Sequence, residues 1–215
     1  MKKNILIVGS NSDIAKSLMF NSEFNFIKLT SSKNEFNILD KDTFPTIDNL
    51  DGIVYFPGTI NLKPFNSLKT KDFKEDYEIN VLGLINILQY YIPFLNDNSS
   101  LVLISTVAAK VGLKFHASIA MCKSAIQGLT ISLASELSPR IRVNCVSPSI
   151  INTKLASRIL RNDTTTQNII NDHPLKRIGK PEDISNMIEF LLSDKSSWIT
   201  GQNMHVDGGL SSIKL

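Results

Sequence analysis

NILIVGSNSDIAKSLMF, residues 4–20, decides the class of fold. Residues 4–9 form a short apolar run with β-branched side chains, which predicts a strand buried on both faces. Residues 12–20 carry apolar side chains at helical spacing, and the small polar residues before them are typical of a turn. The stretch therefore predicts a buried strand that leads through a tight turn into a helix.

The same alternation continues along the chain. Further strands are predicted at residues 24–30, 52–58, 100–106, 141–149 and 202–209, and further helices at 72–95, 118–138 and 181–194. Apolar strands that alternate with helices form parallel sheets covered on both faces. We therefore expect one doubly wound, Rossmann-like α/β domain over residues 1–215. It should have a parallel sheet of about seven strands, with ligands beyond their carboxyl ends.

Composition argues against several classes of function. The net charge is only +3, and basic residues such as Lys71 and Lys74 stand singly beside Asp72 and Glu75, which is typical of solvated surfaces rather than of nucleic-acid binding. No apolar run approaches ~18 residues, so no membrane role is expected. Cys122 and Cys145 have apolar neighbours and lack metal-ligand spacing. They are expected to be reduced core thiols of a cytoplasmic protein without a metal site.

The turn after the first strand has the character of a dinucleotide-binding turn. Such a turn needs a glycine for the tight bend, small residues for close approach, and free N–H groups at the helix start. Gly9 supplies the glycine and Ser10, Asn11 and Ser12 the small residues, whereas Asp13 and Ala15 stand where glycine is usual. The alternative is an ordinary strand-to-helix turn capped by Ser12.

The end of the second strand indicates which dinucleotide is bound. An acidic residue there favours a free ribose 2′-hydroxyl, whereas basic and hydroxyl groups favour a 2′-phosphate. Thr30, Ser31, Ser32 and Lys33 stand at this corner, with no acid before Glu35. NADP(H) is therefore expected in preference to NAD(H). The alternative is a polar loop whose lysine is only solvated.

Taken together, these segments resemble the short-chain dehydrogenase/reductase family from end to end. RVNCVSPSIINT (142–153) resembles the strand and Pro-Gly turn beside the nicotinamide, with Ser149 in place of the glycine. HPLKRIGKPEDISNMIEFLLSDKSSWITGQNMHVDGG (173–209) resembles the family's closing segment almost word for word. NILD (37–40) resembles the motif that supports the adenine, and INVLG (79–83) the helix with the active-site asparagine. The family's Asn-Asn-Ala-Gly is similar to residues 55–58, although only Gly58 is kept.

The resemblance implies a set of cofactor-binding residues. They are Gly9, Ser10, Asn11, Ser12, Asp13, Ile14, Ser31, Lys33, Asn37, Ile38, Gly58, Lys123, Pro148, Ile151 and Thr153. It also implies a homodimer or homotetramer, and a substrate lid over residues 151–179 whose Thr/Asn-rich middle is expected to be a mobile loop.

FHASIAMCKSAIQGL, residues 115–129, resembles the active-site helix of the family. The resemblance implies an NAD(P)(H)-dependent oxidoreductase that acts on a carbonyl or secondary alcohol of a small molecule. It places the catalytic lysine at Lys123, the hydroxyl at Thr106 (or Ser105, if the turn is shifted) and the asparagine at Asn80. The family's catalytic tyrosine falls on Ile119, which has no proton to donate.

Two interpretations of Ile119 remain open. His116 stands seven residues before Lys123 and therefore near the same helix face, and an imidazole can act as a general acid near neutral pH. Tyr55, at a strand end, is a second candidate for the proton donor. Alternatively, the chain has lost the chemistry and binds nucleotide, or serves as an assembly or regulatory subunit.

Overall fold

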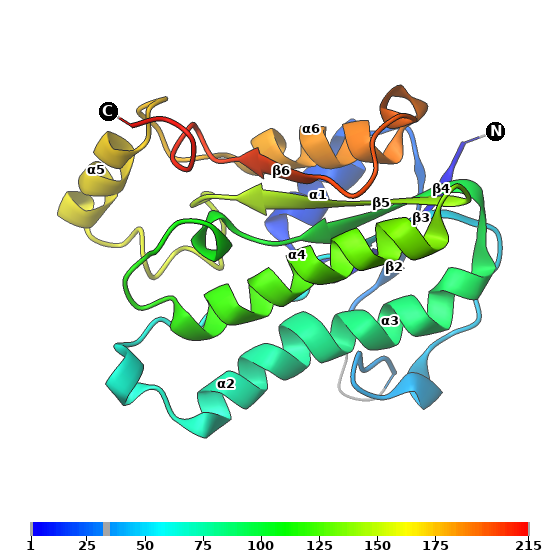
Figure 1. Cartoon of the computed structure of the whole chain (residues 1–215), viewed down its shortest axis with the longest axis horizontal. Coiled ribbons are helices and arrows are strands. Elements are labelled where there is room, and N and C mark those ends of the chain that lie inside the picture. The colour runs from blue at the N-terminus through cyan, green and yellow to red at the C-terminus, as the bar shows by residue number, and fades with distance from the viewer. Residues whose placement is uncertain (1, 32–34, 215) are drawn as a thin grey trace.

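The computed structural model describes residues 2–31 and 35–214. Its described part contains one sheet of six parallel strands in the order β2-β1-β3-β4-β5-β6 (Figure 1). The strands are β1 (Asn4–Val8), β2 (Asn25–Leu29), β3 (Leu50–Tyr55), β4 (Leu95–Ile104), β5 (Ile141–Pro148) and β6 (Asn203–Val206). The doubly wound α/β class expected from the sequence is confirmed.

Helices cover both faces of the sheet, as Figure 1 shows. One face carries α2 (Thr70–Tyr77), α3 (Gly83–Tyr91) and α4 (Ala117–Leu137), and the other carries α1 (Asp13–Asn21) and α6 (Pro181–Leu192). A further helix, α5 (Asp163–Asp172), lies beyond the carboxyl ends of the strands (Figure 1). In sheets of this kind ligands bind beyond the carboxyl ends of the strands, so a ligand is expected at that end of the sheet.

Alternation along each strand produces two hydrophobic cores. On β1, Leu6 and Val8 face α3 and α4, whereas Ile5 and Ile7 face α1 and α6. All four side chains are fully buried. Because successive strand residues point to opposite faces, a strand covered on both sides has to be apolar at every position.

The described part of the sheet has six strands, whereas about seven were expected, and residues 37–40 add none to it. Asn37 and Asp40 make only an isolated bridge, and a short 3-10 helix follows at Lys41–Thr43. The side-chain oxygen of Asn37 accepts the N–H of Leu39 at 3.0 Å, and the Thr43 hydroxyl accepts that of Asn37 at 2.9 Å. Short polar side chains thus accept hydrogen bonds from backbone N–H groups that would otherwise pair with a neighbouring strand.

Aromatic residues of α3 hold this segment instead. The hydroxyls of Tyr90 and Tyr91 donate to the carbonyls of Phe44 and Pro45, at 3.2 and 2.9 Å. The rings of Phe44 and Tyr91 stack with their centroids 6.1 Å apart. Tyr90 and Tyr91 are therefore packing residues.

The helix expected at 72–95 is interrupted where function was expected. Residues Glu78–Leu82 form a π-helical turn between α2 and α3, and Asn80 lies inside it. The side-chain amide of Asn80 donates to the carbonyl of Asp76, one turn earlier, at 2.8 Å. Single π-turns inside helices often occur at functional sites.

The middle of residues 151–179 was wrongly expected to be a mobile loop. It forms α5, which begins after Asn162, and the Asn162 side chain accepts the N–H of Thr165 at 2.9 Å. Asparagine before an acidic first turn is a common helix start, so the cap is the physical reason for this helix.

Helix α4 has the length and apolar composition of a membrane span. It packs against β5, and its buried residues Ile126 and Ala134 belong to the hydrophobic core. A core helix meets the same criteria of length and composition, so α4 is weak evidence for a membrane segment. The two cysteines are buried and free, as expected of core thiols.

A substitution at Gly83 tests how tightly the chain packs against the hydrophobic core directly after the π-helical turn. A β-carbon at Gly83 would lie 2.6 Å from the Tyr55 hydroxyl and 2.7 Å from Ile38 Cδ1. We expect Gly83→Ala to lower the free energy of unfolding by about 2 kcal/mol, because both neighbours are buried and have no room to move. Denaturant-induced unfolding measures this loss.

The matched control is Gly128→Ala on α4, where, apart from adjacent residues and the backbone of its own helix, no heavy atom of the described residues lies within 4 Å of the new carbon. This change should be neutral or stabilise by up to about 1 kcal/mol, since alanine is the better helix former. Equal stabilities of the two variants would contradict this tight packing.

Candidate active site

The turn between β1 and α1 requires glycine at its first position. Gly9 has φ +79°, and a β-carbon there would lie 2.9 Å from the ring of Pro57. Its N–H donates to the carbonyl of Leu29 at 2.8 Å, and the hydroxyls of Ser10 and Thr30 are hydrogen-bonded at 2.5 Å. The turn is thus tied to the end of β2 by hydrogen bonds.

The other residues of this turn have different environments. Asn11 is exposed, and Ser12 precedes α1 without a side-chain capping bond. Ile14 packs against the core beneath α1. The carboxylate of Asp13 accepts the backbone N–H of Lys154 at 2.7 Å, so it joins the start of α1 to the segment after β5.

The described residues at the adenine end of the expected site have different environments. Ser31 and Asn37 are exposed, and Lys33, like Ser32, lies outside the described residues. Ile38 is buried, and its carbonyl accepts from the Asn86 side chain at 3.1 Å. Its side chain is thus a core residue beneath Gly83.

Lys123 is the centre of the expected catalytic residues. Its amine donates to the carbonyl of Ile104, at the end of β4, at 3.0 Å. A point one bond from the Gly58 α-carbon lies 3.1 Å from Asn80 Oδ1 and 3.8 Å from Lys123 Nζ. The structure therefore brings Lys123, Asn80 and Gly58 together at the carboxyl ends of β3 and β4.

Burial changes the acidity of this lysine. Part of the Lys123 side chain is exposed, but its amine lies deep among protein atoms. Desolvation disfavours the ammonium form and lowers the pKa of Lys123 to about 8. The lysine is thus poised to change charge close to neutral pH.

The two candidate hydroxyls have different roles. Ser105 is buried; its hydroxyl donates to the carbonyl of Lys123 at 2.9 Å and accepts from Gln127 at 3.0 Å. This hydroxyl fixes α4 to the end of β4. Thr106 is partly exposed, accepts the N–H of Ala108 at 3.3 Å and lies 3.5 Å from the carbonyl of Pro148. Thr106 is therefore the hydroxyl available to a ligand.

The expected proton donors are not equally suitable. Ile119, four residues before Lys123, is only 4% exposed. Tyr55 is a wrong candidate, because it is buried and its hydroxyl donates to the carbonyl of Ile79 at 2.6 Å. Desolvation raises the pKa of Tyr55 far above its ordinary value.

His116 immediately precedes α4 and is partly exposed. Its backbone has φ −100° and ψ 12°, which is not helical. Regular helical spacing therefore does not place His116 on the same face as Lys123. Its Nδ1 lies 2.7 Å from the carbonyl of Lys114. A carbonyl only accepts, so Nδ1 carries the proton and Nε2 is left for another partner.

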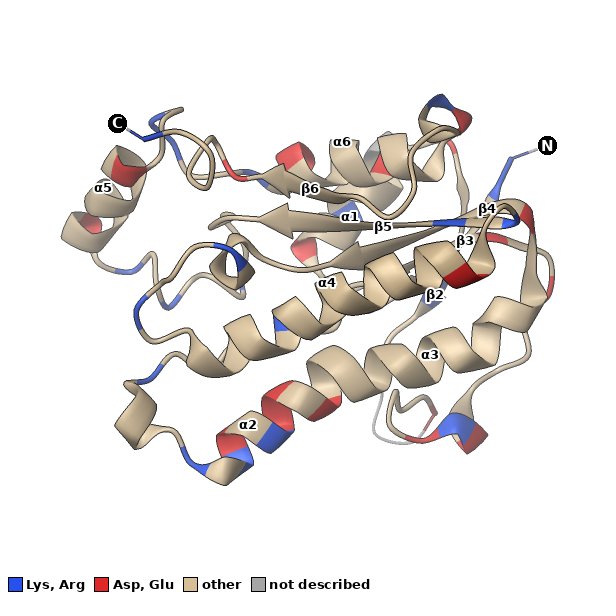
Figure 2. Ribbon diagram, viewed as in Figure 1, with Lys and Arg blue, Asp and Glu red and all other residues tan. Residues whose placement is uncertain are grey.

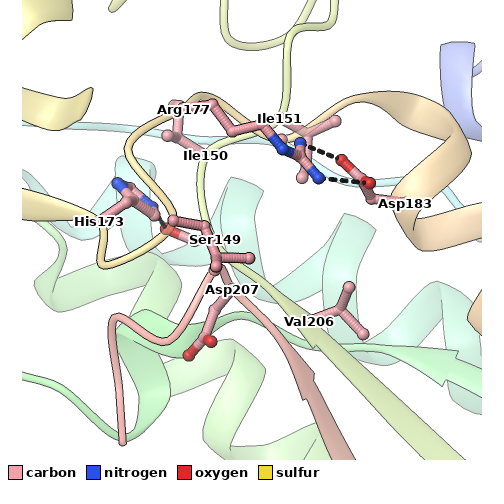
Figure 3. A pocket seen from close by; sticks show the side chains of 11 residues that line it. Ser149, Ile150, Ile151, His173, Arg177, Asp183, Val206 and Asp207 are labelled. Atoms are coloured by element: carbon pink, nitrogen blue, oxygen red, sulfur yellow. Dashed lines mark hydrogen bonds and ion pairs between the residues drawn. The ribbon is translucent and has the colours of Figure 1, made fainter. Parts of the chain in front are cut away.

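A cavity of about 220 Å³ lies beyond the ends of β5 and β6 (Figure 3). His173, which sequence reasoning missed, is buried in its wall. Its Nδ1–H donates to the carbonyl of Ile169 at 2.6 Å, and its Nε2 therefore accepts from the Ser149 hydroxyl at 2.8 Å. In the sequence, His173 stands before Pro174 at the start of the closing segment, and nothing in that pattern indicates a function for it.

Of the remaining expected residues, Ile151 lines this cavity, and Pro148 and Thr153 lie close to its lining residues in the chain. Ile151 is buried and bridges to Gly179, and the hydroxyl of Thr153 donates to the carbonyl of Ile151 at 3.3 Å. Arg177 donates to both carboxylate oxygens of Asp183, at 2.6 and 2.8 Å (Figure 3). Pro148 ends β5 and is partly exposed.

Sequence reasoning also missed Asp76. This residue of α2 is fully buried, although it is charged in water. Its Oδ1 accepts from the Thr59 hydroxyl at 2.6 Å and from the Asn61 amide at 3.0 Å. The available signal was its spacing, since residues four apart share a helix face and Asp76 stands four before Asn80.

His173 should govern the local stability of α5. We expect His173→Ala to speed amide hydrogen exchange in residues 163–172 by about tenfold, because the variant loses the hydrogen bond that joins this segment to β5. Mass-spectrometric exchange measures the effect. His116→Ala is the control and should leave α5 unchanged; equal protection in the His173 variant would contradict the role of this bond.

Comparison with known proteins supports the same architecture. A family model described as enoyl-(acyl carrier protein) reductase matches residues 31–211. Tropinone reductase-like 3 of Erythroxylum coca is 35% identical over 189 residues, which are 86% of this chain and 71% of that protein. The 3-oxoacyl-[acyl-carrier-protein] reductase FabG of Thermotoga maritima is 32% identical over 187 residues, 81% of this chain and 74% of that protein.

Solved structures agree in fold over almost the whole chain. A short chain dehydrogenase family protein from Francisella tularensis superposes with a TM-score of 0.88 at 23% identity, covering 99% of this chain and 100% of that one. A small-chain dehydrogenase in complex with NADPH has a TM-score of 0.87 at 24% identity, covering 98% and 99%. Sequence similarity of this length and level shows that the chain belongs to the short-chain dehydrogenase/reductase family, whose members are NAD(P)-dependent oxidoreductases.

Proposed function

We propose that the protein is an NAD(P)(H)-dependent oxidoreductase that reduces a carbonyl group, or oxidises a secondary alcohol, on a small molecule. The observation that carries the proposal is the amine of Lys123, held beside Gly58 and Asn80 at the carboxyl edge of the sheet. The names of the relatives, a tropinone reductase-like protein and a 3-oxoacyl reductase, support carbonyl chemistry.

The residues present fit a dinucleotide. Gly9 and Gly58 leave spaces that a β-carbon would fill, and Asn80 Oδ1 is buried without a partner among the described residues. Gly9, Ser10, Asn11 and Ser12 would hold the pyrophosphate, with Pro148, Ile151 and Thr153 near the nicotinamide. Thr30 and Ser31, with no acid beside them, support NADP(H) in preference to NAD(H).

In this proposal, a bound nicotinamide supplies or accepts the hydride. The amine of Lys123 holds the ribose and, when charged, stabilises negative charge on the substrate oxygen. The hydroxyl of Thr106 orients the carbonyl. Ile119 has no proton to exchange, so we assign proton transfer to His116. This residue directly precedes α4, so its approach to the substrate depends on the Nε2 that is free of the Lys114 contact rather than on regular helical spacing.

We propose that residues 151–179 form the lid over the substrate. Contacts at both ends of the segment support this assignment, because Lys154 is bound by Asp13 and Arg177 by Asp183. Ordered contacts at its ends allow the segment to move as a unit around α5.

We also propose that the chain acts as a homodimer or homotetramer in the cytoplasm, associating through α2, α3 and α4. Large apolar side chains stay exposed on this face in the single chain, which supports association; they are Tyr77, Leu82, Met121 and Ile131.

A second function is favoured by two specific observations. Ile119 is a buried apolar residue at the position of the proton donor, and Asp13 places a carboxylate at the turn that would hold a pyrophosphate. Both favour a member of the family that binds nucleotide weakly, or not at all, and serves as an assembly or regulatory subunit.

Calorimetric titration separates the two functions. We expect NADPH to bind more tightly than NADH, and Lys123→Met to weaken NADPH binding about tenfold by removing a charged hydrogen-bond donor. Absence of binding for both nucleotides at millimolar concentration would rule out the oxidoreductase.

Substitution of Ile119 tests whether the site lacks only a proton donor. We expect Ile119→Tyr to raise NADPH-dependent reduction of ketones, acyl-thioester models or keto-sugars tenfold or more, because it restores a general acid four residues before Lys123. Ile119→Phe is the matched control: it adds the ring without the hydroxyl and should give no gain. His116→Ala should reduce turnover of the unmodified enzyme, and unchanged turnover would remove the histidine from the mechanism.

A further inference from the structure

The amine of Lys123 carries a positive charge in an environment that offers it little compensation. Lys123 is the only basic residue of α4, and Figure 2 shows that α3 and nearly all of α4 are free of charge. One of its three amine hydrogens binds the carbonyl of Ile104. A buried ammonium is strongly disfavoured unless an opposite charge is close.

Three titratable groups lie near enough to influence the charge of Lys123. They are Cys145 of β5, Cys122 of α4 and Asp76 of α2. Burial raises the pKa of the Cys122 thiol to about 11 and that of Cys145 to about 12, so both are neutral at physiological pH. Of these three groups, Asp76 alone can supply a negative charge.

The Asp76 carboxylate has one oxygen bound and one unbound. Its Oδ1 accepts two side-chain hydrogen bonds, from the Thr59 hydroxyl at 2.6 Å and the Asn61 amide at 3.0 Å. Its Oδ2 is buried and has no hydrogen-bond partner among the described residues. Asn80 Oδ1, four residues later and next to Lys123, is also unpaired within the described part of the chain.

Packing brings these groups together. Helix α4 contacts both α2 and the π-helical turn, so Asp76 and Asn80 lie against the helix that carries Lys123. The helix that carries Lys123, whose ammonium has unused N–H donors, thus packs against two elements that each carry an acceptor without a partner among the described residues.

We propose that Asp76 is the counter-ion of Lys123, a positioning residue that keeps the lysine protonated near neutral pH. Its carboxylate acts on the amine through the buried space beside Asn80, without touching substrate. The consequence for NADPH binding rests on the proposed function; the effect on Lys123 itself does not.

The titration of Lys123 tests the pair without any cofactor. The protein is labelled with ¹³C-lysine, the Lys123 signal is assigned by its loss in Lys123→Met, and its chemical shift is followed from pH 6 to 11. We expect Asp76→Asn to lower the midpoint of Lys123 by about one pH unit or more, since an opposite charge nearby favours the charged form. An unchanged midpoint in folded Asp76→Asn would overturn the proposal.

Two controls separate the local charge from general effects. Glu75→Gln removes the same charge from an exposed neighbour on α2 and should leave the midpoint unchanged; a drop equal to that of Asp76→Asn would also overturn the proposal. Asp76→Glu keeps the charge and should keep the midpoint near that of the unmodified protein. If Asp76→Asn does not fold, Asp76→Ser tests the same loss of charge with a smaller side chain and the same expected decrease.

NADPH binding gives the functional consequence. In Asp76→Asn we expect the NADPH dissociation constant to rise roughly five-fold at pH 8 and to stay unchanged at pH 6, where the lysine is protonated in both proteins. An equal loss at both pH values indicates structural damage and contradicts the counter-ion. A lowered midpoint in a protein that binds no nucleotide would support the counter-ion while ruling out the proposed oxidoreductase.

Discussion

A lysine amine held in a largely apolar environment is the constraint around which the carboxyl edge of this sheet is organised. Lys123 reaches the edge from α4 and binds the carbonyl of Ile104 at the end of β4. Ser105, the next residue, fixes the same helix through the carbonyl of Lys123. The amine is thus aimed at Gly58, where the absence of a side chain leaves space beside it.

The π-helical turn is the second part of this arrangement. A regular helix from α2 to α3 would follow a uniform spacing, whereas one extra residue in the turn changes the direction of Asn80 relative to α3. The Asn80 amide satisfies the carbonyl of Asp76 at the point where the pattern changes. The same turn requires Gly83, because Tyr55 and Ile38 fill the space where its side chain would lie. Asn80 and Gly83 therefore connect the candidate active site with the core beneath α3.

The two ends of the expected nucleotide site are built by different means. At the pyrophosphate end, backbone geometry at Gly9 and a bond to β2 define the turn. At the adenine end, aromatic residues of α3 and local polar bonds hold residues 36–45, which do not add a strand to the sheet. A segment held by side chains can keep its place without strand pairing.

The sequence by itself determined the order of strands and helices, the two-sided parallel sheet and the family. These follow from local periodicity and from matching segments, which do not depend on contacts between distant residues. The resemblance to the family also placed Lys123, Asn80 and Gly58 in one site. Only the tertiary structure decided that Tyr55 faces the core and that Ser105 is a structural hydroxyl, because strand alternation does not say which partner each face meets. Likewise, only packing between α2 and α4 makes Asp76 a neighbour of Lys123, since the two residues are far apart in sequence and no local pattern joins them.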